Sequence, residues 1–235
     1  MEPWTQRIAV SWPVTLNFYE RRYALLRKLE EGNLLRRFHS QDDRVHVLLG
    51  DPNHELTLRD DGLDLRLLQP DASLDRAREA LLIVLDGIAP KRLARPRLTF
   101  RWLVELAADY DEAREEAGRQ LFDPPRGVAV EDFALVVDGA TDEPPASYHL
   151  ECGIVDRAET PDRLARPRRG VEPGSSVWLP ESLPEVAFFC DSEWEIQQAA
   201  DPSADGVMEI WSQMRETARR VVVSLTRQVV GEDIE

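Results

Sequence analysis

The stretch that decides the fold is Arg97-Leu98-Thr99-Phe100-Arg101-Trp102-Leu103-Val104-Glu105, which follows Pro96 directly. Its apolar side chains at 98, 100, 102 and 104 alternate with polar ones at most positions between them, and this period of two is typical of a β-strand with one buried face. A second long stretch, from 184 to 198, places Phe188, Cys190 and Trp194 on one side in the same way. We therefore expect two long, aromatic-rich strands.

Shorter patterns fill in the elements around these two strands. A period of two predicts further strands within 7–14 and over 35–39, 44–49, 54–59, 63–68, 133–137 and 148–154. The turn Asp60-Asp61-Gly62 predicts a tight hairpin, with the glycine supplying a positive φ. Apolar residues at helical spacing predict helices over 19–30, 74–89, 107–122 and 207–229, the last one started by Ser203 or Asp205.

These elements predict an α+β fold of antiparallel sheets with covering helices. Each half combines strands with a helix, so we expect two related halves, 1–122 and 123–235, packed as one compact unit. We expect the long amphipathic helix over 207–229 to close the structure.

The order of these elements also suggests a resemblance. A hairpin at 54–68, a helix at 74–89, the strand that holds Phe100-Arg101-Trp102, and a terminal helix containing Ser224-Leu225-Thr226 follow one another. This order resembles a sporadically distributed family of uncharacterised bacterial proteins of about this length, with two related α+β halves. The resemblance implies the fold and supplies no activity.

Composition indicates the cellular compartment in which we expect the protein. The 235 residues contain no apolar run near the ~18 residues that span a bilayer, so no membrane association is expected. The first residues show no basic region followed by an apolar stretch, which argues against secretion. Cys152 and Cys190 are the two cysteines, too few for a disulfide framework, and we expect them to be reduced and buried. These features predict a cytoplasmic protein.

The net charge of −15 is unevenly placed along the chain. Up to Phe122 there are 19 basic and 21 acidic residues, whereas from Asp123 onward there are 10 basic and 23 acidic residues. Such a field repels phosphate backbones, which argues against nucleic acid as a direct ligand, and it favours encounter with a basic partner surface. The simpler interpretation, which we favour, is that the acidic surface keeps the protein soluble.

One basic segment stands out within the acidic half. Residues 158–176 contain little apolar sequence and are expected to form a long exposed loop. Arginines in and beside it could bind an anion, a nucleic-acid backbone or an acidic surface of a partner, or could form salt bridges with the molecule's own acidic residues. They are Arg157, Arg163, Arg166, Arg168 and Arg169.

Acidic and histidine residues provide the other candidate sites. Asp191, Glu193 and Glu195 alternate on the polar face of the second long strand, where they could bind a divalent ion, contact arginines or simply face solvent. His149 and Glu151 should share a face, with Cys152 on the opposite one. Histidines 39, 46 and 54 lie on or beside neighbouring strands and could cluster across the sheet.

Motifs of known chemistry are missing from the sequence. There is no Gly-Lys-Ser/Thr phosphate loop and no Gly-x-Ser-x-Gly nucleophile elbow, and no cofactor is indicated. The sequence therefore favours a non-enzymatic protein-interaction module of the bacterial cytosol, acting on another protein in a toxin-immunity or phage-defence setting, and leaves a homodimer open. The alternative is a metal-dependent enzyme or nucleic-acid-processing accessory that uses Asp191, Glu193 and Glu195.

Overall fold

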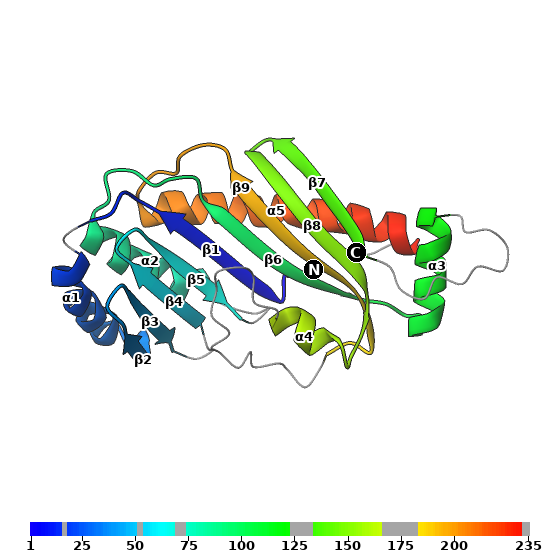
Figure 1. Ribbon diagram of the computed structural model, residues 1–235, viewed down its shortest axis with the longest axis horizontal. Helices are drawn as coiled ribbons and strands as arrows, with labels where there is room; N and C mark the ends of the chain where they lie inside the picture. Colours follow the sequence, from blue (N-terminus) through cyan, green and yellow to red (C-terminus); the bar gives the residue numbers. More distant parts are fainter. Residues whose placement is uncertain (16–17, 51–53, 69–73, 123–133, 166–182, 232–235) are drawn as a thin grey trace.

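The computed structural model confirms the α+β fold with a nine-stranded antiparallel sheet (Figure 1). It describes residues 1–15, 18–50, 54–68, 74–122, 134–165 and 183–231. The strand order across the sheet is β2-β3-β4-β5-β1-β6-β9-β8-β7. The strands are β1 (Thr5–Ser11), β2 (Leu35–Ser40), β3 (Arg44–Leu49), β4 (His54–Arg59), β5 (Gly62–Leu67), β6 (Arg97–Glu105), β7 (Leu135–Asp142), β8 (Pro145–Asp156) and β9 (Val186–Ile196).

The two long aromatic strands lie side by side near the middle of this sheet. β6 pairs with β9 over its whole length, with Trp102 opposite Cys190 and Val104 opposite Phe188. The Trp102 indole N–H donates to Ser192 Oγ at 3.3 Å, so the ring is buried with its polar atom satisfied. The prediction of two aromatic strands is confirmed, and their pairing joins the first six strands to the last three.

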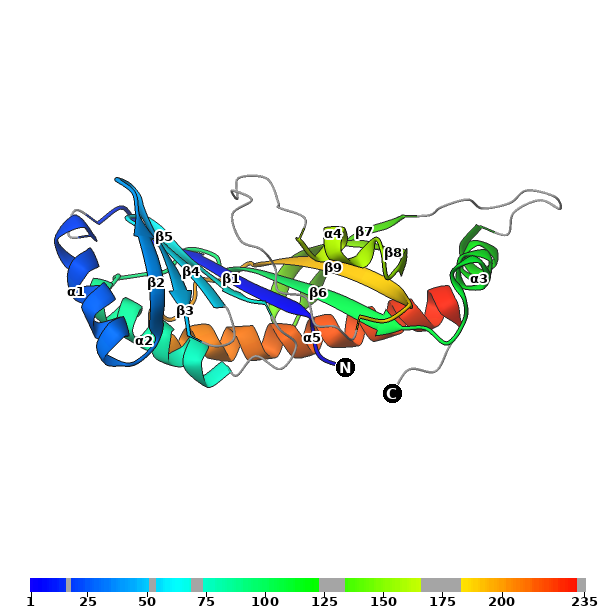
Figure 2. The same cartoon turned by 90° about the horizontal axis from the view of Figure 1, so that it is seen from below.

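In the described part of the chain, four helices lie along one face of the sheet or at its ends, and Figure 2 shows α5 running along the face, α1 beside β2 and α3 next to the far end of α5. They are α1 (Phe18–Glu31), α2 (Leu74–Ile88), α3 (Tyr110–Phe122) and α5 (Ala204–Val230), and a short α4 (Thr160–Ala165) lies on the other face. α1 ends where Asn33 adopts a left-handed φ of 53°. No helix in the described part of the chain is long and apolar enough to cross a membrane.

Helix α5 closes the core as the sequence predicts. Ser203 is its N-cap, whose Oγ accepts a hydrogen bond from Gly206 N at 3.0 Å, and Gly231 ends it with a φ of 73°. Its buried stripe packs against α2, α3, β6 and β9. Trp211 lies in that stripe and donates its indole N–H to Gln6 Oε1 of β1 at 3.1 Å. One helix thus contacts strands of both predicted halves.

The hairpin of β4 and β5 is confirmed, but the reason expected for its glycine is wrong. Gly62 has no positive φ, and among the described residues only Asn33, Ala89 and Gly231 do. Gly62 is the first residue of β5 and pairs with Ser11 of β1. A Cβ at this position would lie 2.5 Å from the carbonyl oxygen of Val10, so the close approach of β1 is what requires glycine.

A second correction concerns the loop expected over 158–176. Its described part contains helix α4, in which Thr160 and Leu164 are buried. Leu164 packs with Leu103, Val155 and Phe189 in a small apolar cluster on the sheet face opposite α5. Residues 166–182 lie outside the described residues.

Candidate functional site

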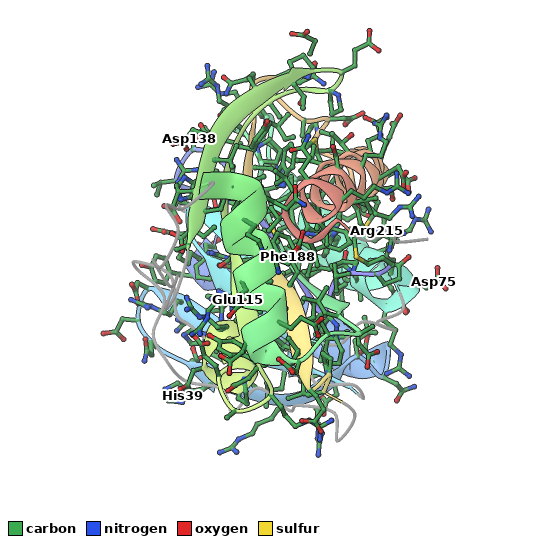
Figure 3. The ribbon with its side chains drawn as sticks, turned by 90° about the vertical axis from the view of Figure 1, so that its right-hand side faces the viewer. His39, Asp75, Glu115, Asp138, Phe188 and Arg215 are labelled. Carbon is green, nitrogen blue, oxygen red and sulfur yellow. The ribbon has the colours of Figure 1, made fainter. Side chains whose placement is uncertain are left out.

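The sheet face opposite α5 is hollowed over much of its width. Alternate residues of each strand point to this side, for example Arg7 and Ala9 of β1, while Ile8 and Val10 point into the core. The hollow has a volume of about 2640 Å³ and reaches from β2 to β8. Figure 3 shows His39 of β2 and Asp138 of β7 on one side of the molecule, with Asp75 of α2 and Arg215 of α5 on the other. We call this hollowed surface the open face.

Charged side chains line the open face in unequal numbers. Ten arginines and six carboxylates among the described residues line the hollow, an excess of four positive charges in a chain whose net charge is −15. The arginines are Arg7, Arg36, Arg37, Arg44, Arg59, Arg66, Arg92, Arg95, Arg97 and Arg101, and the carboxylates are those of Glu55, Asp64, Glu151, Asp191, Glu193 and Glu195. The open face is therefore basic on a molecule that is acidic as a whole.

The two signs are also separated across the open face. All ten arginines lie on β1–β6 or on the connection that precedes β6, whereas four of the six carboxylates lie on β8 and β9. The strand order places β9 and β8 next to each other at one side of β6. The open face thus has a basic part over β1–β6 and an acidic part over β8 and β9.

The centre of the basic part is an ion-pair cluster. Arg7 of β1 stands directly opposite Arg66 of β5, an arrangement of like charges that is unfavourable by itself. Asp64 lies between them: Arg7 Nε donates to both carboxylate oxygens at 2.9 Å, and Arg66 Nε lies 3.8 Å from Oδ1. Glu55 lies 3.6 Å from Arg66 Nη1. These two arginines are neutralised within the protein.

Three other arginines of the open face have no such partner among the residues that the structure describes. Arg37, Arg92 and Arg95 are exposed, and the described part of the chain contains no hydrogen bond or ion pair to any of them. Between Arg92 and Arg95 lies Ala94, whose backbone N–H donates to Ser11 O at 2.7 Å and so holds this segment at the end of β1. These guanidinium groups are the cations best placed to meet an external anion.

The predicted acidic residues lie on the open face, as the alternation of β9 indicates. Two of them meet arginines of β6: Asp191 Oδ2 accepts from Arg101 Nε at 3.2 Å, and Glu195 lies 3.6 Å from Arg97. Arg101 also donates to the Leu164 carbonyl oxygen, which ties α4 to the sheet. Among the residues that the structure describes, no group of three or more His, Cys, Asp or Glu is placed to hold a metal ion.

Two of the five predicted loop arginines, Arg157 and Arg163, make contacts within the protein. Arg157 donates from Nε to the Leu183 carbonyl oxygen at 2.9 Å and pairs with Glu185. Arg163 pairs with Glu159 one turn earlier in the chain. Arg166, Arg168 and Arg169 lie outside the described residues. The role of these arginines as a partner surface stays a prediction.

The histidines separate onto different faces. His39 and His46 stand opposite each other on the open face, and His46 Nδ1 lies 3.0 Å from Thr57 Oγ1. His54 points the other way and is buried, and this burial lowers its pKa to about 4. The structure therefore brings two of these three histidines together and separates the third.

His149 and Cys152 lie on opposite faces of β8, as predicted. His149 on the open face contacts Asp138 Oδ1 at 2.8 Å, and this hydrogen bond raises the pKa of the imidazole. Cys152 is buried on the core side directly opposite Cys190, with 2.9 Å between the two Sγ atoms. Burial raises the pKa of the Cys190 thiol well above its ordinary value.

Sequence reasoning did not assemble the arginines of β1–β6 into one surface, because they are scattered from position 7 to 101. The available signal was their position on the polar side of each alternating strand. Comparison with known proteins adds no assignment: no protein-family model matches the chain, and no curated protein matches it.

Proposed function

We propose that this chain is a protein-interaction module whose open face binds an acidic segment of another polypeptide. The observation that carries the proposal is the excess of arginine over carboxylate in a large hollow on an otherwise acidic molecule. Complementary charge guides association and selects among partners. Arg37, Arg92 and Arg95 supply cations that the described part of the protein does not itself neutralise.

The size of the hollow favours a macromolecular ligand. Sites for small molecules are typically clefts of ~300–1,000 Å³ that enclose most of the ligand. The volume of about 2640 Å³ is well beyond this range, and the hollow extends across strands from β2 to β8. An extended polypeptide segment or a protein surface fits such a site better than a metabolite.

The distribution of charge favours a polypeptide over a nucleic acid. Proteins that bind single strands combine basic grooves with a series of exposed aromatic rings. Among the described residues that line the hollow, Phe38 at its β2 edge is the one exposed aromatic residue, and its ring points to the helix side of the sheet. The acidic part over β8 and β9 repels phosphates but can receive lysine or arginine. We therefore expect the partner's acidic residues over β1–β6 and its basic residues over β8 and β9.

The test measures the binding of a fluorescein-labelled peptide that alternates glutamate and valine, by fluorescence anisotropy at about 50 mM salt, where screening is modest. Replacing Arg92 and Arg95 together by glutamate should raise Kd at least about tenfold, since each exposed pair is worth up to ~1 kcal/mol and is replaced by repulsion. The matched control is Lys28→Glu with Arg219→Glu, which makes the same change of net charge on α1 and α5.

Three outcomes would contradict the proposal. The first is no binding of the acidic peptide at micromolar protein. The second is equal loss of affinity in the control variant, which would assign the effect to net charge alone. The third is tighter binding of a single-stranded oligothymidine than of the peptide, which would assign the open face to nucleic acid.

A further inference from the structure

Strand β2 ends the sheet and pairs on one side with β3. No strand in the described part of the chain pairs with its other side. The edge of a sheet presents a row of backbone N–H and C=O groups that can pair with another extended chain. Recognition of a peptide as an added strand uses such an edge, with alternate side chains giving the specificity.

The two faces of β2 differ in chemical character. Arg37 and His39 lie on the open face and are exposed. Phe38 stands opposite the buried Val47, so it points to the helix side of the sheet, yet 47% of it is exposed. A strand added beside β2 would therefore meet basic side chains on one face and an aromatic ring on the other.

Helix α1 extends the aromatic side of this edge. Tyr19 and Tyr23 are 48% and 59% exposed, and the Arg22 guanidinium lies 5.7 and 5.0 Å from the centres of their rings. Arg22 Nη1 also donates to the carbonyl oxygen of Gln41, one residue beyond β2, at 3.3 Å. The two tyrosines therefore lie near the end of β2, and Figure 1 shows α1 beside this strand.

Because exposed aromatic side chains close together mark interaction sites, we propose that the partner's acidic segment adds to β2 as a tenth strand. Its sequence alternates acidic and apolar residues. The acidic ones face Arg37 and His39, and the apolar ones pack on Phe38, Tyr19 and Tyr23. This inference rests on the proposed function: one part of the segment pairs with β2, and the residues that follow it cross the open face towards Arg92 and Arg95 at the end of β1, which is four strands from β2 in the sheet.

A second copy of this chain is a less suitable occupant of the edge. Pairing β2 with β2 of another copy would bring Arg36, Arg37 and His39 of each strand close to the same residues of the other. Like charges on adjacent strands are destabilising. Basic residues on an edge strand discourage such self-pairing, and the same residues attract a strand that carries carboxylates.

The test uses the alternating glutamate–valine peptide in two backbone-methylated forms. Successive residues of a strand direct their N–H groups to opposite sides, so methylating the glutamate nitrogens or the valine nitrogens blocks opposite edges of the peptide. We expect one form to bind at least about tenfold more weakly than the parent and the other to bind within about threefold. Both forms keep the charge and composition of the parent.

Side-chain variants give an independent measurement. Phe38→Ala should raise Kd for the parent peptide about tenfold, in the range of anchor residues at interfaces. The control is Leu82→Ala, because Leu82 is also a large exposed apolar residue but belongs to α2, which has no part in the proposed site. A peptide of the same composition with glutamates and valines in separate blocks should bind at least about tenfold more weakly than the alternating one.

Equal affinity of the two methylated forms, with binding still dependent on Arg92 and Arg95, would overturn the added strand and leave the proposed function intact. Equal affinity of the alternating and block peptides would have the same meaning. Failure of every acidic peptide to bind would overturn both.

Discussion

The Asp191–Arg101 pair provides the sharpest test of how the acidic residues of β9 are used. The two side chains are 10% and 12% exposed, with 3.2 Å between Arg101 Nε and Asp191 Oδ2. Asp191→Asn keeps the size of the side chain and removes its charge, leaving the arginine without its carboxylate in a largely dry site. Breaking a buried pair in this way costs ~3–5 kcal/mol. Because both side chains are still partly exposed, we expect Asp191→Asn to lower the free energy of unfolding by ~2–4 kcal/mol.

Glu195→Gln is the matched control on the same strand. Its pair with Arg97 is longer, at 3.6 Å, and the side chains are 37% and 73% exposed. Exposed pairs of this kind are worth at most ~1 kcal/mol. Urea unfolding followed by tryptophan fluorescence should show a midpoint urea concentration for Asp191→Asn that is ~1 M lower than that of the control, for an m-value of ~2–3 kcal/mol/M.

The opposite result would refute this reasoning. If Asp191, Glu193 and Glu195 formed an unneutralised group of carboxylates, removal of one charge would relieve repulsion and raise the free energy of unfolding. Asp191→Asn as stable as wild type, or more stable, would therefore contradict the ion pair and favour a cation site. A double-mutant cycle with Arg101→Gln should give a coupling energy of ~1–3 kcal/mol.

Three further predictions concern titratable groups in the described structure. Because burial lowers the pKa of His54 to about 4, the unfolded chain binds a proton there near pH 6.5 that the folded protein does not, so stability should fall as the pH drops from 6.5 towards 4. Urea unfolding at several pH values should show that the free energy of unfolding falls by about 2 kcal/mol by pH 5. This loss should disappear in His54→Phe and persist in His39→Gln. The same pH dependence in both variants would contradict the assignment to His54. The imidazole of His149 should titrate by NMR above the ordinary pKa and shift down in Asp138→Asn, and a midpoint that does not move would exclude the hydrogen bond as the cause. The Cys190 thiol, buried and of raised pKa, should react with a thiol reagent only in step with unfolding by urea, whereas rapid labelling in native buffer would disprove its burial.

Local patterns were sufficient to predict most elements of this fold. The alternation of Leu98, Phe100 and Trp102 with Arg97, Thr99 and Arg101 depends on which side chains face the core, and this is encoded residue by residue. The helical spacing around Trp211 predicted α5 for the same reason. Both predictions are confirmed because the apolar side of each element packs into the core.

Strand order could not be predicted in the same way. β1 lies between β5 and β6, and β9 pairs with β6 across some ninety residues of sequence, as the Arg101–Asp191 register shows. Such pairings depend on the packing of the whole molecule and leave no local pattern. The contacts of Asp191 and Glu195 with β6 therefore became evident only in the structure.

The candidate site was not predicted for the same reason, because it depends on the order of the strands. Arginines close together in sequence, such as Arg163 and Arg166, attracted attention as a cluster, whereas Arg37 and Arg95 lie far apart in the chain and share a surface only once the strands are ordered. Helix α4 was missed because Leu164 is a single apolar residue in an arginine-rich segment. Its burial depends on the apolar cluster supplied by other strands.

The most direct test of the central claim is NMR of isotope-labelled protein titrated with the glutamate–valine peptide. If the open face binds acidic polypeptide, the side-chain Nε–H signals of Arg92 and Arg95 and the backbone amides of β2 should shift with peptide concentration, while the amides of α5 stay unchanged. Shifts confined to α5 and the other helices of the covered face, or no shifts at a concentration where the labelled peptide is bound, would contradict the account.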